Sequence, residues 1–252
     1  MKTEPSISIK LQHELQILRE AGKILSEIRS ELQRSLTLGV TTGEIDALAE
    51  QLMKDRGVIP AFKGYRGFPH SICVSINQEV VHGIPSKRII QEGDVVSLDI
   101  GIIHHHYYAD SAVTVGVGAL NPKLRELLEV ASSALYKGIE QAREGNHLSD
   151  ISHAIQTFVE GHKFSIVRDF VGHGIGRKLH EDPEIPNFGP PHQGPVLKAG
   201  MVFAIEPMVN VGTWQTKILE DGWTVVTQDG QPSAHFEHTV AITQNGPEIL
   251  TA

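Results

Sequence analysis

The chain has 252 residues, enough to bury a hydrophobic core without disulfides, and its 40% hydrophobic and 21% charged residues are typical of a globular protein. A formal net charge of −8 argues against direct DNA binding or attachment to an anionic membrane, and no run of about 18 apolar residues predicts a membrane span. A single cysteine, Cys73, excludes an intrachain disulfide, and the opening MKTEPSISIK holds no apolar signal segment, so we expect a cytoplasmic protein.

Two amphipathic helices are predicted at the start of the chain. From Ile9 to Leu36, apolar residues recur at steps of three and four, which is typical of a surface helix with one buried face. The segment TTGE then fits a capping box, in which Thr41 and Glu44 satisfy each other's backbone N–H groups. A second helix is therefore expected to begin at this segment.

The segment DIGIIHHHYYAD, from Asp99 to Asp110, predicts an antiparallel hairpin with its histidines at the tip. A tip centred on His104 and His105 would place Asp99 directly across from Asp110, with Cβ atoms roughly 5 Å apart. Two such carboxylates repel each other in a buried sheet unless one is protonated or a cation lies between them. A solvated pair is the alternative, but the apolar residues around Asp99 argue against an exposed strand.

The three histidines of this hairpin are not the predicted metal ligands. Consecutive residues at a hairpin tip point in different directions and remain in water, so His104, His105 and His106 are interpreted as an exposed loop. The aspartates at the two ends of the segment are the better candidates.

Further candidate ligands lie in the second half of the chain. Glu206 and Glu237 each interrupt an apolar, strand-like run with an acid. His173 lies in the segment VGHGIGRK, whose glycines allow close backbone approach and do not match the dinucleotide-binding fingerprint. Four carboxylates and one imidazole favour Mn, Fe or Co, with Zn possible, and two such ions about 3.5–4 Å apart could activate a hydroxide for hydrolysis.

The order of these features is repeated along the chain. LREAGKIL in the first half is echoed by LRELLEVA in the second, and VVSLDIGI by VFAIEPMV, which places Glu206 opposite Asp99. We predict a single α+β domain with an internal duplication, its halves spanning roughly residues 9–118 and 119–250. Such a duplication would form one shared core with a cleft along the axis between the halves.

Together these motifs resemble the type I methionine aminopeptidases, members of peptidase family M24 with the pita-bread fold. The resemblance runs from Ile9 to Leu250 and rests on SICVSINQEVVHGIP, VSLDIGI, YYADSA, VGHGIGRKLHEDP, FAIEPMV, DGWTV and FEHT. It implies two pseudo-symmetric halves with antiparallel sheets flanked by helices. It also implies a site for two divalent metal ions (Co, Mn, Fe or Zn) bridged by Asp110 and Glu237, with the full ligand set Asp99, Asp110, His173, Glu206 and Glu237.

The resemblance also implies residues that act on the substrate. Glu206 would help to move a proton during attack by water, while His82 and His180 would hydrogen-bond the peptide groups of the substrate and the developing oxyanion. Phe62 and Leu179 depart from residues common in bacterial relatives, which puts the fine shape of the pocket in doubt. A methionine pocket is implied at Tyr65, Phe68, Cys73 and Trp223, and the two histidines would contact the substrate as well.

The implied activity is removal of the initiator methionine from nascent chains, at the ribosome and by a monomer, when the second residue is small. One alternative is another dimetal exopeptidase similar to prolidase or aminopeptidase P, although those enzymes add an N-terminal domain. Another is a non-catalytic pita-bread protein that binds peptides or ribosomes. A binding protein would have no physical need for mutually repelling carboxylates, so a complete ligand set favours an enzyme.

Overall fold

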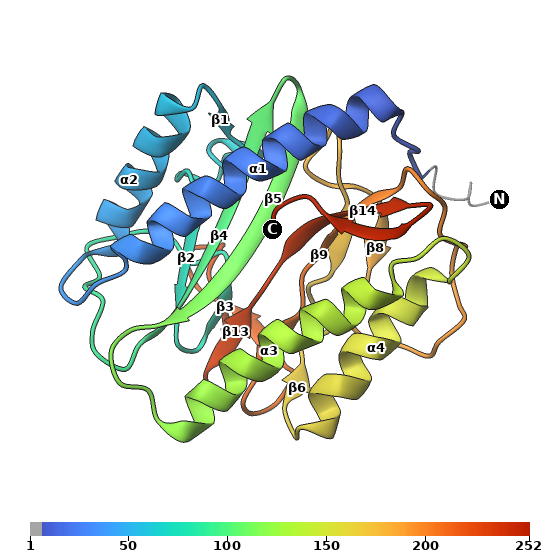
Figure 1. Cartoon of the computed structure of the whole chain (residues 1–252). Coiled ribbons are helices and arrows are strands. Elements are labelled where there is room, and N and C mark those ends of the chain that lie inside the picture. Colours follow the sequence, from blue (N-terminus) through green and yellow to red (C-terminus); the bar gives the residue numbers. More distant parts are fainter. Residues whose placement is uncertain (1–6) are drawn as a thin grey trace.

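The computed structural model describes residues 7–252, and its helices cover one side of a group of antiparallel sheets (Figure 1). The first half contributes α1 (Gln12–Ser35) and α2 (Thr42–Asp55), and the second half contributes α3 (Pro122–Gln141) and α4 (Leu148–Gly161). A short 3₁₀ helix, η1, spans Tyr65–Gly67. Within residues 7–252, no helix is both long enough and apolar enough to cross a bilayer.

Both helices predicted at the start of the chain are present. The buried side of α1 includes Leu15, Leu18 and Leu25, as the apolar spacing predicts, although the helix begins at Gln12 and not at Ile9. In α2, the Thr41 side chain accepts a hydrogen bond from the Glu44 N–H, and the Glu44 carboxylate accepts one from the Thr41 N–H. The predicted capping box is confirmed.

The predicted hairpin forms between β4 (Val95–His104) and β5 (Tyr107–Gly116), but its turn differs from the prediction. His104 pairs with Tyr107, so the two-residue turn is His105-His106. Both turn residues have positive φ, 47° and 68°, as a type I′ turn requires. The segment lacks the Asn-Gly signal that would have located this turn in the sequence.

The relative placement of the two aspartates changes accordingly. Asp99 lies opposite Ala112, and Asp110 lies opposite Gly101, so the prediction of a directly opposed pair was wrong. The register differs by two residues in total, and side chains alternate with a period of two. Asp99 and Asp110 therefore still share one face of the hairpin as diagonal neighbours.

Within residues 7–252, the strands form four antiparallel sheets. In the first, β5 pairs with the whole length of β4 on one edge, while β2 (Cys73–Ile76) and then β1 (Ile59–Pro60) pair with successive parts of its other edge. The largest has the order β15-β14-β9-β7-β8, with strands Gly246–Ile249, His238–Thr243, Val202–Ile205, Gly172–Gly174 and Glu181–Ile185. The two small sheets are β13-β10-β6 (Ser233–His235, Met208–Asn210, Ser165–Ile166) and β11-β12-β3 (Thr216–Ile218, Val225–Thr227, Glu79–Val81).

The two halves correspond in the order of their elements. α2 and α4 each have 14 residues, and each is followed by a two-residue strand, β1 and β6 respectively. This correspondence fits the predicted duplication with halves of roughly 9–118 and 119–250, which stays a prediction.

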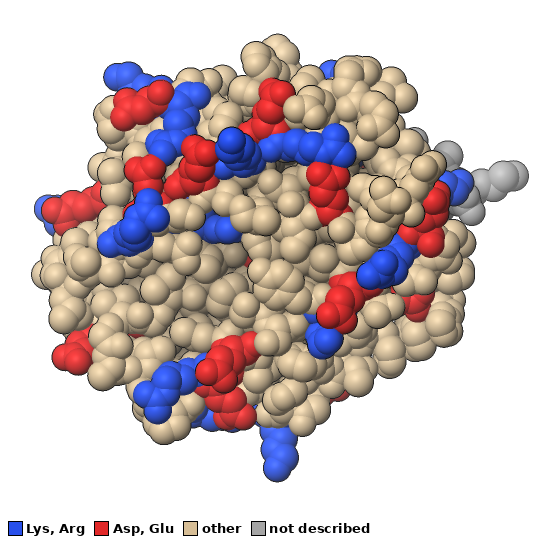
Figure 2. Space-filling view, in the orientation of Figure 1, with Lys and Arg blue, Asp and Glu red and all other residues tan. Residues whose placement is uncertain are grey.

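Each half has its own hydrophobic core, and a third cluster joins them. Leu18 of α1, Cys73 of β2 and Val202 of β9 are buried in this third cluster, which therefore draws on both halves. On the face seen in Figure 2, acidic and basic side chains alternate along α1 and α3. That face carries no extended positive patch of the kind that binds nucleic acid.

Candidate metal centre

Beside the third hydrophobic cluster lies a cavity of about 400 Å³. It draws on both halves of the chain, which agrees with the expected cleft. Every residue that the sequence analysis assigned to the site lines this cavity: Tyr65, Phe68, Cys73, His82, Asp99, Asp110, His173, His180, Glu206, Trp223 and Glu237.

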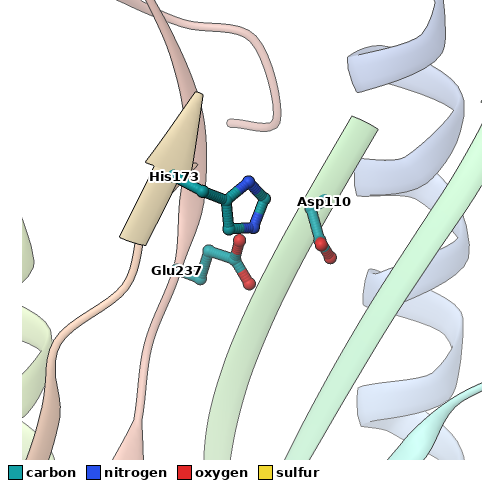
Figure 3. A group of neighbouring side chains, drawn as sticks. All are labelled: Asp110, His173 and Glu237. Carbon is teal, nitrogen blue, oxygen red and sulfur yellow. The ribbon is translucent and has the colours of Figure 1, made fainter. Parts of the chain in front are cut away.

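Three of the predicted metal ligands form a compact group (Figure 3). One potential ligand atom from each of Asp110, His173 and Glu237 lies within 4.8 Å of the other two, and all three residues are buried. Asp110 comes from β5, His173 from β7, and Glu237 from the residue before β14. Three distant parts of the chain therefore deliver donor atoms to one point.

Backbone hydrogen bonds fix the distance between two of these segments. The Glu237 N–H donates to the Ala112 carbonyl at 2.9 Å, and the Ala112 N–H donates back to the Glu237 carbonyl at 3.3 Å. The Ser111 hydroxyl also donates to the Glu237 carbonyl at 2.9 Å. The backbone of Glu237 thus pairs with β5, the strand that carries Asp110.

Glu206 and Glu237 do not lie within strands, which corrects the sequence-based expectation. Glu206 follows β9 and precedes Pro207, which has no N–H to continue a ladder. Glu237 lies in the two-residue gap between β13 and β14. Both acids are therefore at breaks between strands, where the chain can turn a side chain into the cavity.

The His173 ring is oriented to bind a metal. Its Nδ1 lies 2.9 Å from the Gly174 carbonyl, which can only accept, so Nδ1 carries the proton and Nε2 keeps a free lone pair. Nε2 lies 3.5 Å from Glu206 Oε1. The backbone here is tightly packed, because a Cβ on Gly174 would lie 2.2 Å from the Asp182 carbonyl oxygen. The glycine beside His173 is required by this close approach.

Burial and mutual repulsion disfavour the charged forms of all four acids. Burial raises the pKa of Asp99 to about 7, and burial together with neighbouring carboxylates raises the pKa of Asp110, Glu206 and Glu237. Asp99 Oδ1 and Glu237 Oε1 are buried and have no hydrogen-bond partner among the described residues. A divalent cation would satisfy these oxygens and offset the repulsion, so the residues present fit a metal.

Two further histidines face the cavity in their neutral form. Burial, with His180 nearby, lowers the pKa of His82 to about 4, and burial also lowers the pKa of His180. His180 Nδ1 lies 2.8 Å from the Tyr65 hydroxyl, and its ring centre lies 4.3 Å from that of His173. His82 has a φ of 59°, a strained value that is common at functional positions.

The remaining wall of the cavity is apolar and aromatic. Phe68 and Trp223 meet edge to face at 5.1 Å between ring centres, and Cys73 is buried beside them. Burial raises the pKa of the Cys73 thiol, so the thiol remains neutral and packs as a small apolar group. Phe62 and Leu179, the two noted departures, also line the cavity.

His235 is a buried histidine beside the cluster that the sequence analysis missed. It is 1% exposed, its ring nitrogens have no hydrogen-bond partner among the described residues, and its Nε2 lies 3.8 Å from Glu206 Oε2. Its position two residues before Glu237 was the available signal, because such residues share a face in an extended segment. His238 instead contacts Thr251 through Nδ1 at 2.9 Å and does not line the cavity.

The hairpin histidines lie away from the candidate metal centre. His105 and His106 are exposed, and His104 is half-buried with its Nε2 3.7 Å from Glu20. The interpretation as an exposed hairpin tip is confirmed for His105 and His106 and is wrong for His104, which is the last residue of β4.

The sequence model of a known family matches residues 16–244, and its description is metallopeptidase family M24. The chain belongs to metallopeptidase family M24. The family predicted from the sequence motifs is therefore confirmed. Membership of this family accounts for the carboxylate and histidine cluster, because members of a metallopeptidase family use a divalent metal.

Close relatives within M24 carry the name of one activity. The chain is 54% identical over 245 residues to methionine aminopeptidase 1 of Bacillus subtilis, covering 97% of this chain and 99% of that one. A crystal structure of methionine aminopeptidase from Thermotoga maritima matches with a TM-score of 0.96 at 47% identity, covering 97% and 99% of the two chains. The predicted α+β pita-bread fold is confirmed by these matches.

A more distant M24 structure helps to weigh the prolidase alternative. Prolidase from Pyrococcus furiosus matches with a TM-score of 0.78 at 27% identity, but the alignment covers 97% of this chain and only 65% of that one. The chain thus corresponds to about two thirds of that enzyme. Both identity and coverage favour the methionine aminopeptidases over the prolidases.

Proposed function

We propose that this protein removes the N-terminal methionine from polypeptides whose second residue is small, by metal-dependent hydrolysis. The observation that carries the proposal is one cavity in which a carboxylate and histidine cluster lies beside an aromatic, sulfur-tolerant wall. An exopeptidase needs both features, because the scissile bond must reach the metal while the terminal side chain is held next to it. The similarity to methionine aminopeptidases over almost the full chain supports the same activity.

The proposed cofactor is a pair of divalent ions, Co, Mn, Fe or Zn. The proposed ligands are Asp99, Asp110, His173, Glu206 and Glu237, with Asp110 and Glu237 shared between the ions. Bound divalent ions polarise a peptide carbonyl and lower the pKa of a water molecule, which supplies a nucleophile near neutral pH. The oxygen-rich donor set supports this choice of metals.

The remaining polar residues act on the substrate. Glu206 is proposed to accept the proton of the attacking water and to return it to the leaving amine. His82 and His180 are proposed to hydrogen-bond the substrate's peptide groups and the negative charge that develops on the carbonyl oxygen. Their lowered pKa values leave them neutral at pH 7, so they act as hydrogen-bonding groups and not as fixed cations.

The apolar wall is proposed to bind the methionine side chain. A flexible thioether packs well against aromatic rings and a neutral thiol, which supports roles for the side chains Tyr65, Phe68, Cys73 and Trp223. Limited space beside His82 would then restrict the second residue. We also propose that the protein is a cytoplasmic monomer that acts on nascent chains at the ribosome.

The test is hydrolysis of Met-Gly-Met-Met before and after treatment with a metal chelator. Release of methionine that is lost with chelation and restored by a divalent ion supports the proposal. Turnover of dipeptides with proline second, in place of Met-Gly-Met-Met, would instead support a prolidase. Failure to cleave either substrate in the metal-loaded protein would favour a binding protein and overturn the proposal.

A further inference from the structure

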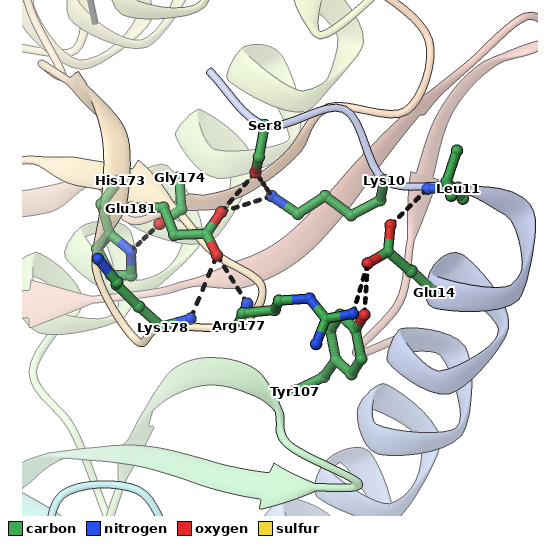
Figure 4. A network of polar contacts seen from close by, with 10 residues as sticks. All are labelled: Ser8, Lys10, Leu11, Glu14, Tyr107, His173, Gly174, Arg177, Lys178 and Glu181. Atoms are coloured by element: carbon green, nitrogen blue, oxygen red, sulfur yellow. Dashed lines mark hydrogen bonds and ion pairs between the residues drawn. The ribbon is translucent and has the colours of Figure 1, made fainter. Parts of the chain in front are cut away.

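An ion pair beside the cavity joins the beginning of the chain to the turn that carries His180 (Figure 4). Lys10 Nζ donates to Glu181 Oε2 at 2.7 Å, and the two side chains are only 5% and 14% exposed. The Ser8 hydroxyl donates to the same Glu181 oxygen at 2.6 Å. Glu181 is the residue directly after His180, so this contact lies one peptide unit from a proposed substrate-binding group.

The other oxygen of Glu181 holds the turn itself. Glu181 Oε1 accepts hydrogen bonds from the backbone N–H groups of Arg177 at 2.7 Å and Lys178 at 3.2 Å. One carboxylate thus closes the turn of residues 176–181 with one oxygen and binds the N-terminal segment with the other. Burial alone would raise the pKa of Glu181, but hydrogen bonds from Lys10 and Ser8 hold it below its usual value.

The N-terminal segment is itself anchored, so it can act as a fixed support. The Lys10 N–H donates to the Gly200 carbonyl at 2.7 Å, and the Lys10 side chain packs directly on Gly176. A Cβ on Gly176 would lie 2.5 Å from Lys10 Cε, so a larger residue there would displace the end of the lysine side chain. The Gly176 carbonyl also accepts a hydrogen bond from the Tyr108 N–H at 2.7 Å, two residues before Asp110.

We propose that Lys10 is a positioning residue for His180, acting through Glu181 and the turn of residues 176–181. The inference rests on the proposed role of His180 in the reaction. Lys10 supplies the only cationic side chain paired with Glu181 among the described ion pairs, in a place nearly closed to water. Without it, the carboxylate loses its charged partner and the turn loses one of its links to the N-terminal segment, while the hydrogen bonds from Ser8 and Tyr108 remain.

The expected effect is on turnover and not on metal binding. His180 meets the substrate where charge develops, so a small displacement of its ring should lower kcat more than it raises KM. We expect Lys10→Met to lower kcat by about tenfold, the size typical of losing a buried partner of a site residue. Metal content should remain that of the unsubstituted protein.

The decisive experiment repeats Lys10→Met in a His180→Ala background, with kcat, KM and metal content measured on metal-loaded protein. If Lys10 acts through His180, the substitution should lower kcat less than about twofold there, because coupled residues are not additive. An equal loss in both backgrounds would overturn the proposal. If His180→Ala alone leaves kcat unchanged, the proposed role of His180 fails instead, and the two failures are distinguishable.

Two further variants guard against a general loss of stability. Ser8→Ala removes one hydrogen bond to Glu181 and one that Ser8 accepts from Lys10, but it keeps the charge of the lysine beside Glu181. It should therefore lower kcat in the same direction but by less. Arg19→Met breaks a more exposed ion pair on α1, with Glu248 at 2.7 Å, and should leave kcat unchanged. If Arg19→Met lowers kcat as much as Lys10→Met does, a loss of stability explains both results and positioning is contradicted.

Discussion

Asp110 and Thr239 are joined by two hydrogen bonds, although 129 residues separate them in the chain. The Asp110 N–H donates to the Thr239 hydroxyl at 3.0 Å, and that hydroxyl donates to the Asp110 carbonyl at 2.8 Å. A single buried side chain therefore holds the backbone of a proposed bridging ligand against β14. The position of Asp110 depends on both halves of the fold.

Replacing this hydroxyl should weaken the metal centre. We expect Thr239→Val to destabilise the fold by about 1–3 kcal/mol, because a buried N–H loses its partner, and to weaken metal binding about 10–100-fold. Thr239→Ser keeps the hydroxyl and serves as the matched control. Titration calorimetry with a divalent ion measures the effect. Unchanged metal affinity in the valine variant would show that Thr239 does not hold Asp110 in place for metal binding.

Removing a proposed bridging ligand should abolish function without unfolding the chain. Asp110→Ala removes one of the repelling carboxylates, so the fold should persist while metal affinity and activity fall by about a hundredfold or more. Circular dichroism and release of methionine from Met-Gly-Met-Met measure the two properties. Substantial remaining activity would show that Asp110 is not a metal ligand.

The acids should destabilise the metal-free protein as pH rises. The pKa of Glu237 is raised by burial and by neighbouring acids, so the folded state retains a proton that the unfolded state has released above about pH 4.3. Stability is then lost as pH rises through the folded pKa. Without metal, Glu237→Gln should therefore be more stable than the unsubstituted protein, by a margin that widens above pH 4.3 by up to about 1.4 kcal/mol per unit.

Glu237→Gln must be compared with the unsubstituted protein because the buried histidines change the pH dependence of stability in the opposite direction. The pKa values of His82, His173, His235 and His238 are lowered to about 3–4, mainly by burial, so their contribution to stability is lost as pH falls below about 6.5. This contribution is common to both proteins and cancels in the difference. Denaturant unfolding in chelator measures it, and a margin that shrinks with rising pH would contradict the account.

His180→Ala should separate turnover from metal binding. We expect kcat to fall by about a hundredfold, which is typical of a lost oxyanion donor, while metal content stays near normal. Metal analysis alongside steady-state kinetics tests this. Loss of metal from the variant would mean that His180 is a ligand.

The hairpin histidines should be dispensable. Replacing His104, His105 and His106 with serine should change stability by less than about 0.5 kcal/mol, because His105 and His106 are exposed and the contact of His104 with Glu20 is a weak one at 3.7 Å. The same variant should retain its metal and its activity on methionyl peptides. A large loss of bound metal would restore these residues as candidate ligands.

Chemistry could be predicted from the sequence more completely than geometry. Acids within apolar runs and a histidine among glycines identified the five candidate metal ligands, because burial of an unpaired charge demands a partner. The other predicted cavity residues were implied only by the family resemblance. The hairpin register could not be read, since the His105-His106 turn has no glycine or asparagine to mark it. The side chains of Asp99 and Asp110 still share a face, because a shift of two residues preserves the alternation.

His235 and the Lys10–Glu181 pair show what the sequence could not supply. His235 lies two residues before Glu237, and only coordinates show that it is buried beside Glu206 with ring nitrogens that lack hydrogen-bond partners among the described residues. The lysine and the glutamate are separated by 171 residues, and nothing in their local sequence predicts that they meet. Contacts between distant segments are set by tertiary packing, which local pattern does not record.

Metal titration of the chelated protein, with methionine release followed in the same samples, tests whether the carboxylate and histidine cluster binds the metal that drives hydrolysis. We expect about two divalent ions to bind per chain, with activity on Met-Gly-Met-Met absent before addition and restored as the sites fill. Full activity in the metal-free protein, or the absence of any divalent binding, would contradict this expectation.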